Sequence, residues 1–489
     1  GGGTAGWMAA VLARTFGRRM RITLIESEQI GTVGVGEATI PQIRLINQYL
    51  GLDENEFIAA TQGSFKLGIE FEGWTRPGHR YIHAFGELGR ALDIVPFHHY
   101  WLRARGGGRD LWSWSLNAEA AARNAFARVE PGHSEVASGI NYAFHFDASM
   151  YAAYLRGHAE AGGVQRAEGR VEDIQLDGEA GHLRRLRLED GREIHGDLFI
   201  DCSGFRSLLL GHALGNDYVD WSRWLPCDRA MAVPTSRITP LAPYTRAIAH
   251  KAGWQWRIPL QHRTGNGLVY CSRYLNDDRA AALLLDNVEG EVLTEPRALR
   301  FTTGHRTKFW DRNCVALGLA AGFMEPLEST SIHLIQSGIS RLLTLFPDAG
   351  FAPALIDEYN RQTRLEFERI RDFLILHYHA NGRVGEPFWE ERLMTRVPDS
   401  LARRMQLFRA SGRIVREADE LFTEQSWLQV LLGQGIEATA WHPAADRLGD
   451  ADLSAFLGQT RKAVKRVAAR LPDHAEFLRQ NCPAPPLES

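Results

Sequence analysis

Three glycines at the start of the chain have the spacing G-x-G-x-x-G, namely Gly1, Gly3 and Gly6. Glycines so placed let the backbone turn sharply and approach a pyrophosphate at the N-terminus of the next helix. A predicted helix from Trp7 to about Phe16 and an apolar strand, residues 21–25, follow them. Glu26 ends that strand, where a carboxylate can accept hydrogen bonds from ribose hydroxyls. The pattern predicts a dinucleotide-binding βαβ unit; a flexible glycine-rich terminus is the alternative.

Four further segments combine residue types that are uncommon together. Residues 34–41 are GVGEATIP, and residues 64–69, SFKLGI, place a lysine among apolar residues. Residues 253–259 contain W-x-W-x-I-P, and residues 323–330 are FMEPLEST. With the first glycines, these segments closely resemble the flavin-dependent tryptophan and indole halogenases, from Gly1 to about Trp441. The second pair of motifs is specific, whereas the glycine fingerprint alone would fit any flavoprotein.

The resemblance implies a reaction in two stages. Reduced FAD, O2 and a halide give hypohalous acid, which travels through the protein to a lysine beside an aromatic substrate. Lys66 matches that lysine; its ammonium could hydrogen-bond the oxidant, or its amine could form an N-halo species. Glu328 matches the active-site glutamate, which could orient the oxidant, stabilise the cationic ring or remove its proton, and Ser329 could fix that carboxylate.

Each of these charged residues also has a purely structural interpretation. Lys66 alone could be a surface lysine whose stem follows apolar neighbours. Glu328 alone could be a carboxylate at the start of a helix. Their position inside the matching motifs favours the catalytic interpretation.

The resemblance also assigns the cofactor and halide positions. Residues that match family positions near FAD, in addition to the three glycines and Glu26, are Thr4, Ala5, Gly36, Glu37, Ala38, Thr39, Val171, Leu319 and Ile332. The halide would lie on the backbone amides of Thr330 and Ser331. No metal site is expected, because the adjacent histidines His98 and His99 do not share one face of a helix or strand.

Aromatic residues are assigned to the substrate and to the oxidant's path. His83 and Phe85 would sandwich an indole, because a flat electron-rich ring stacks on aromatic faces; a core histidine and phenylalanine are the alternative. Trp254 and Trp256 are spaced by two and so share one face of a strand. With Pro259 they would line the tunnel and separate substrate from flavin, or they would simply pack in the core.

Two departures from the family pattern bear on specificity. Ser331 replaces the usual glycine, so the halide preference could move from chloride towards bromide. The C-terminal segment around Trp441, residues 435–443, lacks the tyrosine pair that grips free tryptophan in relatives. Trp441 remains a candidate substrate residue, and we expect indole or a larger aromatic rather than free tryptophan.

Periodicity predicts the elements that position these residues. Turn signals divide residues 164–202 into a β-meander, and apolar residues recur at helical spacing after about Ala354. We predict an α/β fold: a glutathione-reductase-type, Rossmann-like FAD domain with an inserted β-sheet substrate region and a helical C-terminal part. Residues 1–345 would form the FAD-binding core and residues 346–489 would complete the substrate pocket. The strand that normally precedes the fingerprint would be truncated before Gly1.

Composition excludes several other classes. The chain has 489 residues, with 56 Lys+Arg and 59 Asp+Glu, a net charge of −3 that gives no electrostatic reason to bind nucleic acid or an anionic membrane. The longest apolar run, residues 313–324, is too short to span a bilayer, and five scattered cysteines fit reduced thiols, so we expect a cytoplasmic enzyme.

Partners and rival functions follow from the same motifs. No second dinucleotide fingerprint is present for NAD(P)H, so a separate flavin reductase is expected. The sequence does not determine the oligomeric state, for which a dimer is one alternative. An FAD-dependent aromatic hydroxylase and a non-catalytic flavin-binding protein are the alternative functions.

Overall fold

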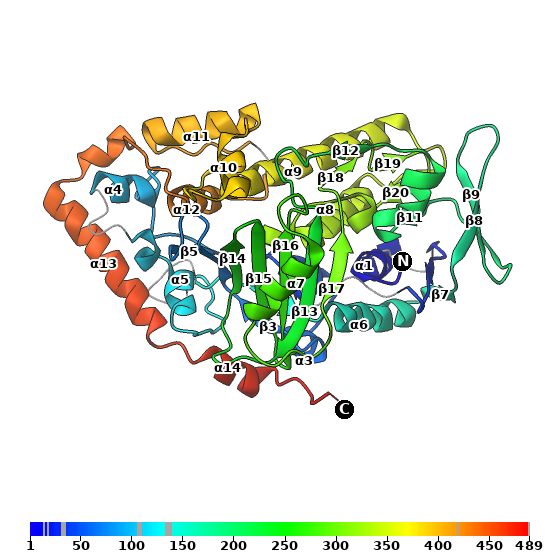
Figure 1. The fold of residues 1–489 in the computed structure, drawn as a ribbon, viewed down its shortest axis with the longest axis horizontal. Coiled ribbons are helices and arrows are strands. Elements are labelled where there is room, and N and C mark those ends of the chain that lie inside the picture. Colours follow the sequence, from blue (N-terminus) through cyan, green and yellow to red (C-terminus); the bar gives the residue numbers. More distant parts are fainter. Residues whose placement is uncertain are drawn as a thin grey trace. The chain divides into compact units, whose positions relative to one another are not determined.

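The computed structural model describes residues 1–12, 15–16, 19–30, 36–104, 110–132, 139–417 and 420–487. Gly34 and Val35 of the GVGEATIP motif lie outside these ranges, as does part of the predicted first helix. The chain forms two compact units, each built from three segments. Unit 1 comprises residues 1–63, 146–228 and 299–368; unit 2 comprises residues 64–145, 229–298 and 369–489. Figure 1 labels many of their elements.

Unit 1 has the mixed α/β character predicted for the nucleotide-binding part. Its helices are α1 (Thr4–Leu12), α2 (Ile43–Tyr49), α3 (Glu54–Ala60), α6 (Ala148–Ala161), α8 (Ser331–Thr344) and the first part of α9 (Pro353–His379). Its strands are β1 (Thr23–Glu26), β2 (Glu37–Ala38), β7 (Gln165–Glu168), β8 (Val171–Leu176), β9 (Leu183–Leu188), β10 (Glu193–His195), β11 (Phe199–Asp201), β12 (Tyr218–Asp220), β18 (Gly304–Arg306), β19 (Trp310–Asp311), β20 (Cys314–Ala316) and β21 (Gly322–Phe323).

Two parallel strand pairs lie in unit 1, where the nucleotide is predicted to bind. β1 pairs in parallel with β7, and β11 pairs in parallel with β20. Helices α6 and α8 both pack against α1. The predicted meander is confirmed for β8, β9 and β10, which form an antiparallel three-stranded sheet. Short one-turn helices η4 (Gly204–Arg206), η5 (Leu208–Ala213), η6 (Gly318–Ala320) and η7 (Pro326–Glu328) connect these strands.

Unit 2 is built on a seven-stranded sheet in the order β17-β13-β16-β15-β14-β4-β5. Its strands are β3 (Ser64–Lys66), β4 (Gly68–Glu72), β5 (Arg80–Ala84), β6 (Ala143–Phe146), β13 (Arg229–Ser236), β14 (Thr245–His250), β15 (Gly253–Pro259), β16 (Arg263–Tyr270) and β17 (Arg297–Arg300). β6 and β17 end just inside segments of unit 1. Helix α7 (Asp277–Asp286) covers β13 and β16, where Ala280 and Leu284 meet Met231, Val233 and Leu268 in a buried core (Figure 1).

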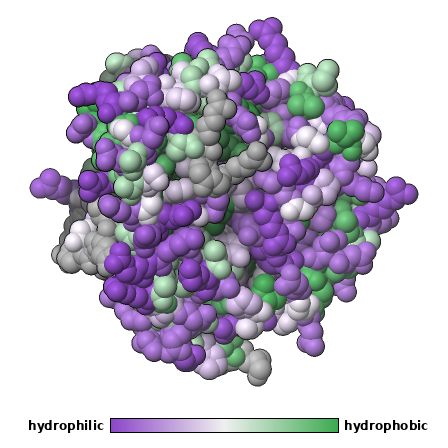
Figure 2. All heavy atoms as spheres, turned by 90° about the vertical axis from the view of Figure 1, so that its left-hand side faces the viewer, coloured by the Kyte–Doolittle hydropathy of each residue, from purple (hydrophilic) through white to green (hydrophobic). Residues whose placement is uncertain are grey.

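The C-terminal part of the chain is helical, as its periodicity predicts. It continues from α9 through α10 (Pro387–Met394), α11 (Asp399–Ser411), α12 (Glu424–Gly433), η8 (Pro443–Arg447), α13 (Asp450–Ala468) and α14 (His474–Asn481). Unit 2 also contains α4 (Phe97–Arg103), η3 (Leu111–Trp114) and α5 (Leu116–Ala121). Within the described residues, no helix is both long and apolar enough to cross a bilayer. Hydrophilic residues predominate on the face drawn in Figure 2.

Candidate functional site

The glycine fingerprint forms a tight turn into α1. A Cβ on Gly1 would lie 2.1 Å from the carbonyl oxygen of Cys202, and one on Gly6 would lie 1.8 Å from that of Gly1. Only glycine fits at these two positions. A Cβ on Gly3, by contrast, would meet no described atom within 4 Å. The turn is therefore closed on the protein side and open at Gly3, which fits the approach of a pyrophosphate to the start of α1.

Glu26 ends β1, as predicted, and is held by neighbouring side chains. Trp7 donates its indole N–H to Oε2 of Glu26 at 3.2 Å, and Arg166 donates to Oε1. Arg156 lies 3.6 Å from the same oxygen. This network fixes the carboxylate beside Gly2, whose absent Cβ would fall 1.6 Å from Oε2. A ribose that binds here would share the carboxylate with two arginines.

Other predicted FAD residues also lie in unit 1. A Cβ on Gly318 would come within 3.0 Å of the Cβ of Ala5, so the turn that carries Leu319 lies against the start of α1. Leu319 is half-buried in η6 and Ile332 is buried in α8, which packs on α1. Gly169 donates its N–H to the carbonyl of Glu26, and Val171 follows at the start of β8.

Glu37 is the predicted FAD residue with a perturbed carboxyl group. It forms β2 with Ala38, after Gly36 and before the buried Thr39. Burial raises the pKa of Glu37 to about 7, and the charge of Asp147 adds to the effect. Asp147 itself caps α6 by accepting hydrogen bonds from the backbone N–H groups of Ser149 and Met150. Glu37 can therefore gain or lose a proton near neutral pH.

The segment of Glu328, Ser329, Thr330 and Ser331 forms the entrance to α8. Glu328 ends η7 and is 1% exposed. Ser329 has φ 59° and ψ 37°, a left-handed conformation that turns the chain sharply before the helix. Thr330 caps α8 without a side-chain hydrogen bond to it. Free amides at a helix N-terminus attract anions, so this geometry suits the predicted halide position.

Ser331 has a conformation that changes one step of the sequence argument. It is the first residue of α8 and has the right-handed helical backbone that serine adopts without strain. The serine therefore imposes no backbone restriction that glycine would relieve. Any effect on halide choice must come from the added side chain.

A half-buried carboxylate on α9, that of Glu366, holds α8. Glu366 accepts hydrogen bonds from His333 at 2.9 Å, Ser337 at 2.8 Å and Arg341 at 3.0 Å, all on α8. Burial alone would raise the pKa of Glu366, but the hydrogen bond and charge of His333 and the charge of Arg341 bring it below its ordinary value. Glu366 is therefore ionised and holds one face of the helix.

Lys66 lies in unit 2 and has no exposed surface (0%). It ends β3, which pairs antiparallel with β6 so that Lys66 faces Ala143. Its ammonium lies 5.4 Å from the centre of the Phe85 ring, a cation–π distance. Leu67, the next residue, accepts the N–H of Phe85 at 2.8 Å. The lysine is therefore a buried residue of a strand, which excludes the surface interpretation.

His83 lies in β5, and Phe85 directly follows that strand. The ring of His83 lies 5.6 Å from Phe373 and 6.3 Å from Phe422, and those two phenylalanines stack 3.8 Å apart. On the backbone between the two residues, Gln429 accepts the N–H of Ala84 at 3.0 Å and donates to its carbonyl at 2.9 Å. Gln429, from α12, thus makes both backbone hydrogen bonds of Ala84 at the edge strand β5. The aromatic residues around His83 include two from the C-terminal part of the chain, Phe373 and Phe422.

The two tryptophans of β15 have different surroundings. Trp254 is buried and packs against Trp74 at 6.3 Å and against Trp256 at 6.2 Å. Trp256 is half-buried and lies over Gly267, where a Cβ would be 2.0 Å from its ring. Core packing thus accounts for Trp254, and Trp256 is the better candidate for a tunnel wall. Pro259 ends the strand and accepts a hydrogen bond from the Ser64 hydroxyl at 2.6 Å.

Trp441 is half-buried just before η8, and its indole N–H donates to Asp446 at 2.8 Å. One premise of the sequence analysis is wrong: the rings of the adjacent His98 and His99 do come together, with their centres 4.1 Å apart on α4. Neighbouring side chains on a helix can therefore meet. No cluster of three or more metal-ligating side chains occurs among the described residues.

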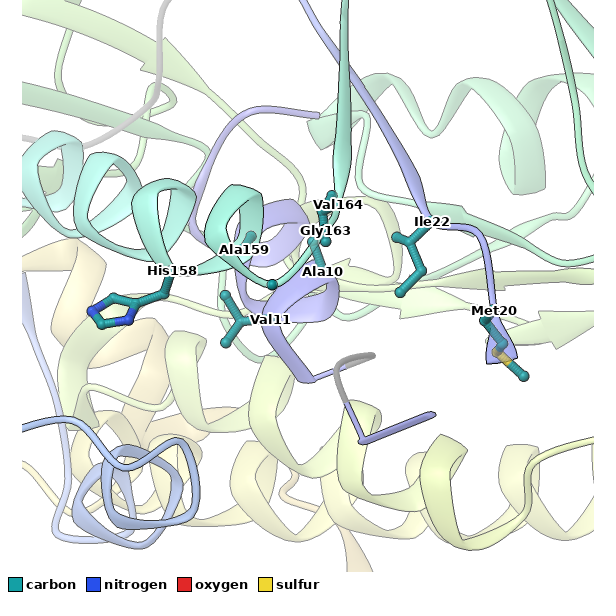
Figure 3. A pocket seen from close by; sticks show the side chains of 9 residues that line it. Ala10, Val11, Met20, Ile22, His158, Ala159, Gly163 and Val164 are labelled. Carbon is teal, nitrogen blue, oxygen red and sulfur yellow. The ribbon is translucent and has the colours of Figure 1, made fainter. Parts of the chain in front are cut away.

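Sequence reasoning missed several residues that support these sites. Phe373, Phe422 and Gln429 lie far along the chain from β5, and no local motif marks them. A separate pocket is lined by Ala10 and Val11 of α1 and His158 of α6 (Figure 3). None of the predicted site residues lines it. The pocket therefore has no part in the candidate site.

The chain is similar to known proteins along nearly its whole length. The family model described as tryptophan halogenase matches residues 1–450. The tryptophan 6-halogenase SttH of Streptomyces toxytricini is 34% identical, over 98% of this chain and 96% of its own. Among solved structures, a flavin-dependent halogenase from Xanthomonas campestris has a TM-score of 0.96 and 52% identity over 99% of this chain and 98% of its own. BrvH, a flavin-dependent halogenase from Brevundimonas sp. BAL3, has a TM-score of 0.94 and 45% identity over 98% of both chains.

Proposed function

The chain belongs to the tryptophan halogenase family of flavin-dependent enzymes, and on that premise we propose that it halogenates an indole-like aromatic ring. Enzymes of this kind act on aromatic substrates with FAD, O2 and halide, and they require a separate flavin reductase. Bound reduced FAD with O2 supplies the oxidising power that converts halide into hypohalous acid. The finer assignments to residues of this chain are the proposal.

In unit 1, the fingerprint turn holds the cofactor's pyrophosphate and Glu26 accepts its ribose hydroxyls. The open side of Gly3 supports the first role, and the position of Glu26 at the end of β1 supports the second. The halide binds to the amides of Thr330 and Ser331, where the positive end of α8 lowers the energy of an anion. Glu366 keeps α8 in place through His333, near its start, and Arg341, in its last turn.

In unit 2, Lys66 holds the oxidant beside the ring. Its ammonium donates a hydrogen bond to the oxygen of hypohalous acid and makes the halogen more electrophilic. A ring carbon forms a bond to the halogen as the oxygen–halogen bond breaks. The oxygen leaves as water with a proton from the lysine, and Glu328 takes the proton that the ring loses. Solvent then returns both groups to their starting states, and the net products are halogenated ring and water.

The observation that carries this proposal is the complete burial of Lys66 against the Phe85 ring. A buried lysine without a function is rare, because an apolar setting disfavours the ammonium. His83 and Phe85 bind the ring by stacking, and Phe373, Phe422 and Gln429 support the further proposal that residues 346–489 complete the substrate pocket.

The direct test is Lys66→Ala, with a flavin reductase, FAD, NADH, bromide and indole. We expect no halogenated product, with FAD binding and the oxidation of reduced flavin unchanged. Lys66→Met is the matched control for bulk, because it keeps an unbranched stem without the charge and should be equally inactive. Substantial product from either variant would contradict the assignment of Lys66.

A further inference from the structure

Two buried histidines hold the strand that carries Lys66. His145, in β6, faces Ser64 across the β3–β6 pair, and its Nδ1 lies 3.1 Å from the Ser64 hydroxyl. His474, the first residue of α14, places Nε2 3.1 Å from the backbone nitrogen of Phe65. Both imidazoles are 0% exposed. They contact the two residues that immediately precede Lys66.

The hydrogen bonds fix the tautomer of His145. The Ser64 hydroxyl has one proton, which it donates to the carbonyl of Pro259 at 2.6 Å, since a carbonyl can only accept. The same oxygen must therefore accept from Nδ1–H of His145. Nε2 of His145 lies 2.9 Å from the Thr245 hydroxyl, from which it can accept. Nδ1 of His145 thus carries a proton, and the lowered pKa of the buried ring leaves Nε2 unprotonated.

His474 has the same tautomer for a different reason. Its Nε2 accepts the N–H of Phe65, so that nitrogen is unprotonated, and its Nδ1–H donates to the carbonyl of Leu241 at 2.9 Å. An imidazolium would turn an N–H group against the N–H of Phe65. Burial lowers the pKa of His474 to about 4, and burial followed by the charge of Lys66 also lowers the pKa of His145.

The contacts connect β3 to the strand of the predicted tunnel. Ser64 bonds to Pro259, the last residue of β15, which carries Trp254 and Trp256. On the other side of Lys66, Leu67 donates its N–H to the carbonyl of Pro243 at 2.7 Å. Phe65 is packed by its ring on Phe126 at 4.0 Å. Ser64 and Phe65, the two residues that precede Lys66, are thus each held by an imidazole.

We propose that His145 and His474 form a histidine clamp that positions Lys66, with His145 acting through Ser64. The proposal rests on the catalytic role of Lys66 given above. Neither histidine touches substrate in this account. The clamp fixes the direction of the lysine and provides polar contacts that add no second positive charge beside its ammonium.

Activity measurements test the clamp through the fate of the oxidant. In reactions with indole and bromide, a β-diketone trap measures hypobromous acid that escapes, and mass spectrometry measures bromoindole. His145→Phe, which keeps ring bulk but no hydrogen bond, should lower kcat for bromoindole about tenfold. KM values should change less than twofold, and trapped oxidant should rise. His145→Asn, which keeps a donor for Ser64, should recover at least a third of the wild-type coupling.

A mutant cycle tests whether His145 acts through Ser64. Ser64→Ala should lower kcat for bromoindole as much as His145→Phe does. The double variant should be at most about twofold slower than the slower of the two single variants. His305→Asn, at a buried histidine of unit 1 that bonds to the carbonyl of Arg306, is the control and should keep full coupling.

A second readout does not depend on turnover. In the ¹⁵N-histidine spectrum of the full chain at pH 7, His145 and His474 should each show a neutral ring with its proton on Nδ1. An imidazolium, or an Nε2–H tautomer at His145, would overturn the clamp. So would unchanged coupling in His145→Phe or additive losses in the cycle, while Lys66→Ala is inactive. If Lys66→Ala stays active, the catalytic assignment of Lys66 fails and the clamp fails with it, whereas failure of the clamp alone leaves Lys66→Ala inactive.

Discussion

The Lys66 ammonium lies 5.4 Å from the centre of the Phe85 ring, and both side chains are buried. The negative face of an aromatic ring attracts a cation, by roughly 0.5–2 kcal/mol according to how far water is excluded. Phe85 can therefore help to keep the buried lysine protonated as well as stack on the substrate. The contact therefore links Lys66, the proposed catalytic residue, with Phe85, a proposed substrate-binding residue, both in unit 2.

Phe85→Leu tests whether the aromatic face of Phe85, rather than its apolar volume, contributes to halogenation. The variant keeps an apolar side chain but loses the ring face, so halogenation should fall roughly three- to thirtyfold at saturating bromide. Oxidation of reduced flavin should not change. Steady-state rates of bromoindole formation measure the effect, with Phe477→Leu as a control at a ring that packs on Phe65. Equal losses in both variants would show that packing alone is responsible.

Glu328 is buried at the entrance to α8. Glu328→Gln keeps its shape and removes its charge, so turnover should fall by about a hundredfold, the scale of a lost proton acceptor or charge-stabilising group. Single-turnover product formation gives the rate. A change below about twofold would make Glu328 a structural residue.

Ser331 supplies a side chain at the predicted halide position. If that side chain disfavours compact, strongly hydrated chloride, the protein should prefer bromide, and Ser331→Gly should move the product ratio towards chloride. Competition reactions with equal chloride and bromide measure the ratio in both proteins. Identical ratios would place the selectivity elsewhere than Ser331.

The raised pKa of Glu37, about 7, has a consequence for stability. The folded protein binds this proton more tightly than the unfolded chain, whose carboxyl titrates near 4.5. The stabilisation is therefore complete below about pH 4.5 and is lost as the pH rises through 7. Glutamine cannot ionise, so Glu37→Gln lacks this loss. Between pH 4 and pH 8.5, its free energy of unfolding should therefore rise by up to roughly 3 kcal/mol relative to that of the wild type. Urea unfolding of the cofactor-free protein at both pH values measures it; parallel pH profiles would contradict it.

Local patterns predicted the elements that local interactions determine. The strand before Glu26 begins two residues later than predicted, and α1 begins three residues earlier, at Thr4. The strand and the helix belong to the βαβ unit, whose backbone geometry and residue spacing recur among nucleotide-binding proteins. The long helix after Ala354 is α9, because its apolar residues recur at helical spacing.

Contacts across large sequence separations could not be predicted in this way. Phe65 and His474 are 409 residues apart, and Ala84 and Gln429 are 345 apart, yet each pair is joined by a side-chain hydrogen bond to the backbone. A histidine or glutamine has no local pattern that reveals such a partner. The burial of Lys66 could not be predicted from residue type either, because lysine is rarely buried.

The measurement that tests the account most directly is mass spectrometry of parallel reactions on indole and tryptophan, with flavin reductase, FAD, NADH and O2. Each runs with bromide, with chloride or without halide, for the wild type and Lys66→Ala. We predict halide-dependent monohalogenated indole from the wild type, at the pyrrole carbon and at least as fast as from tryptophan, and none from Lys66→Ala. A hydroxylated product that forms without halide, or equal halogenation by Lys66→Ala, would contradict the account.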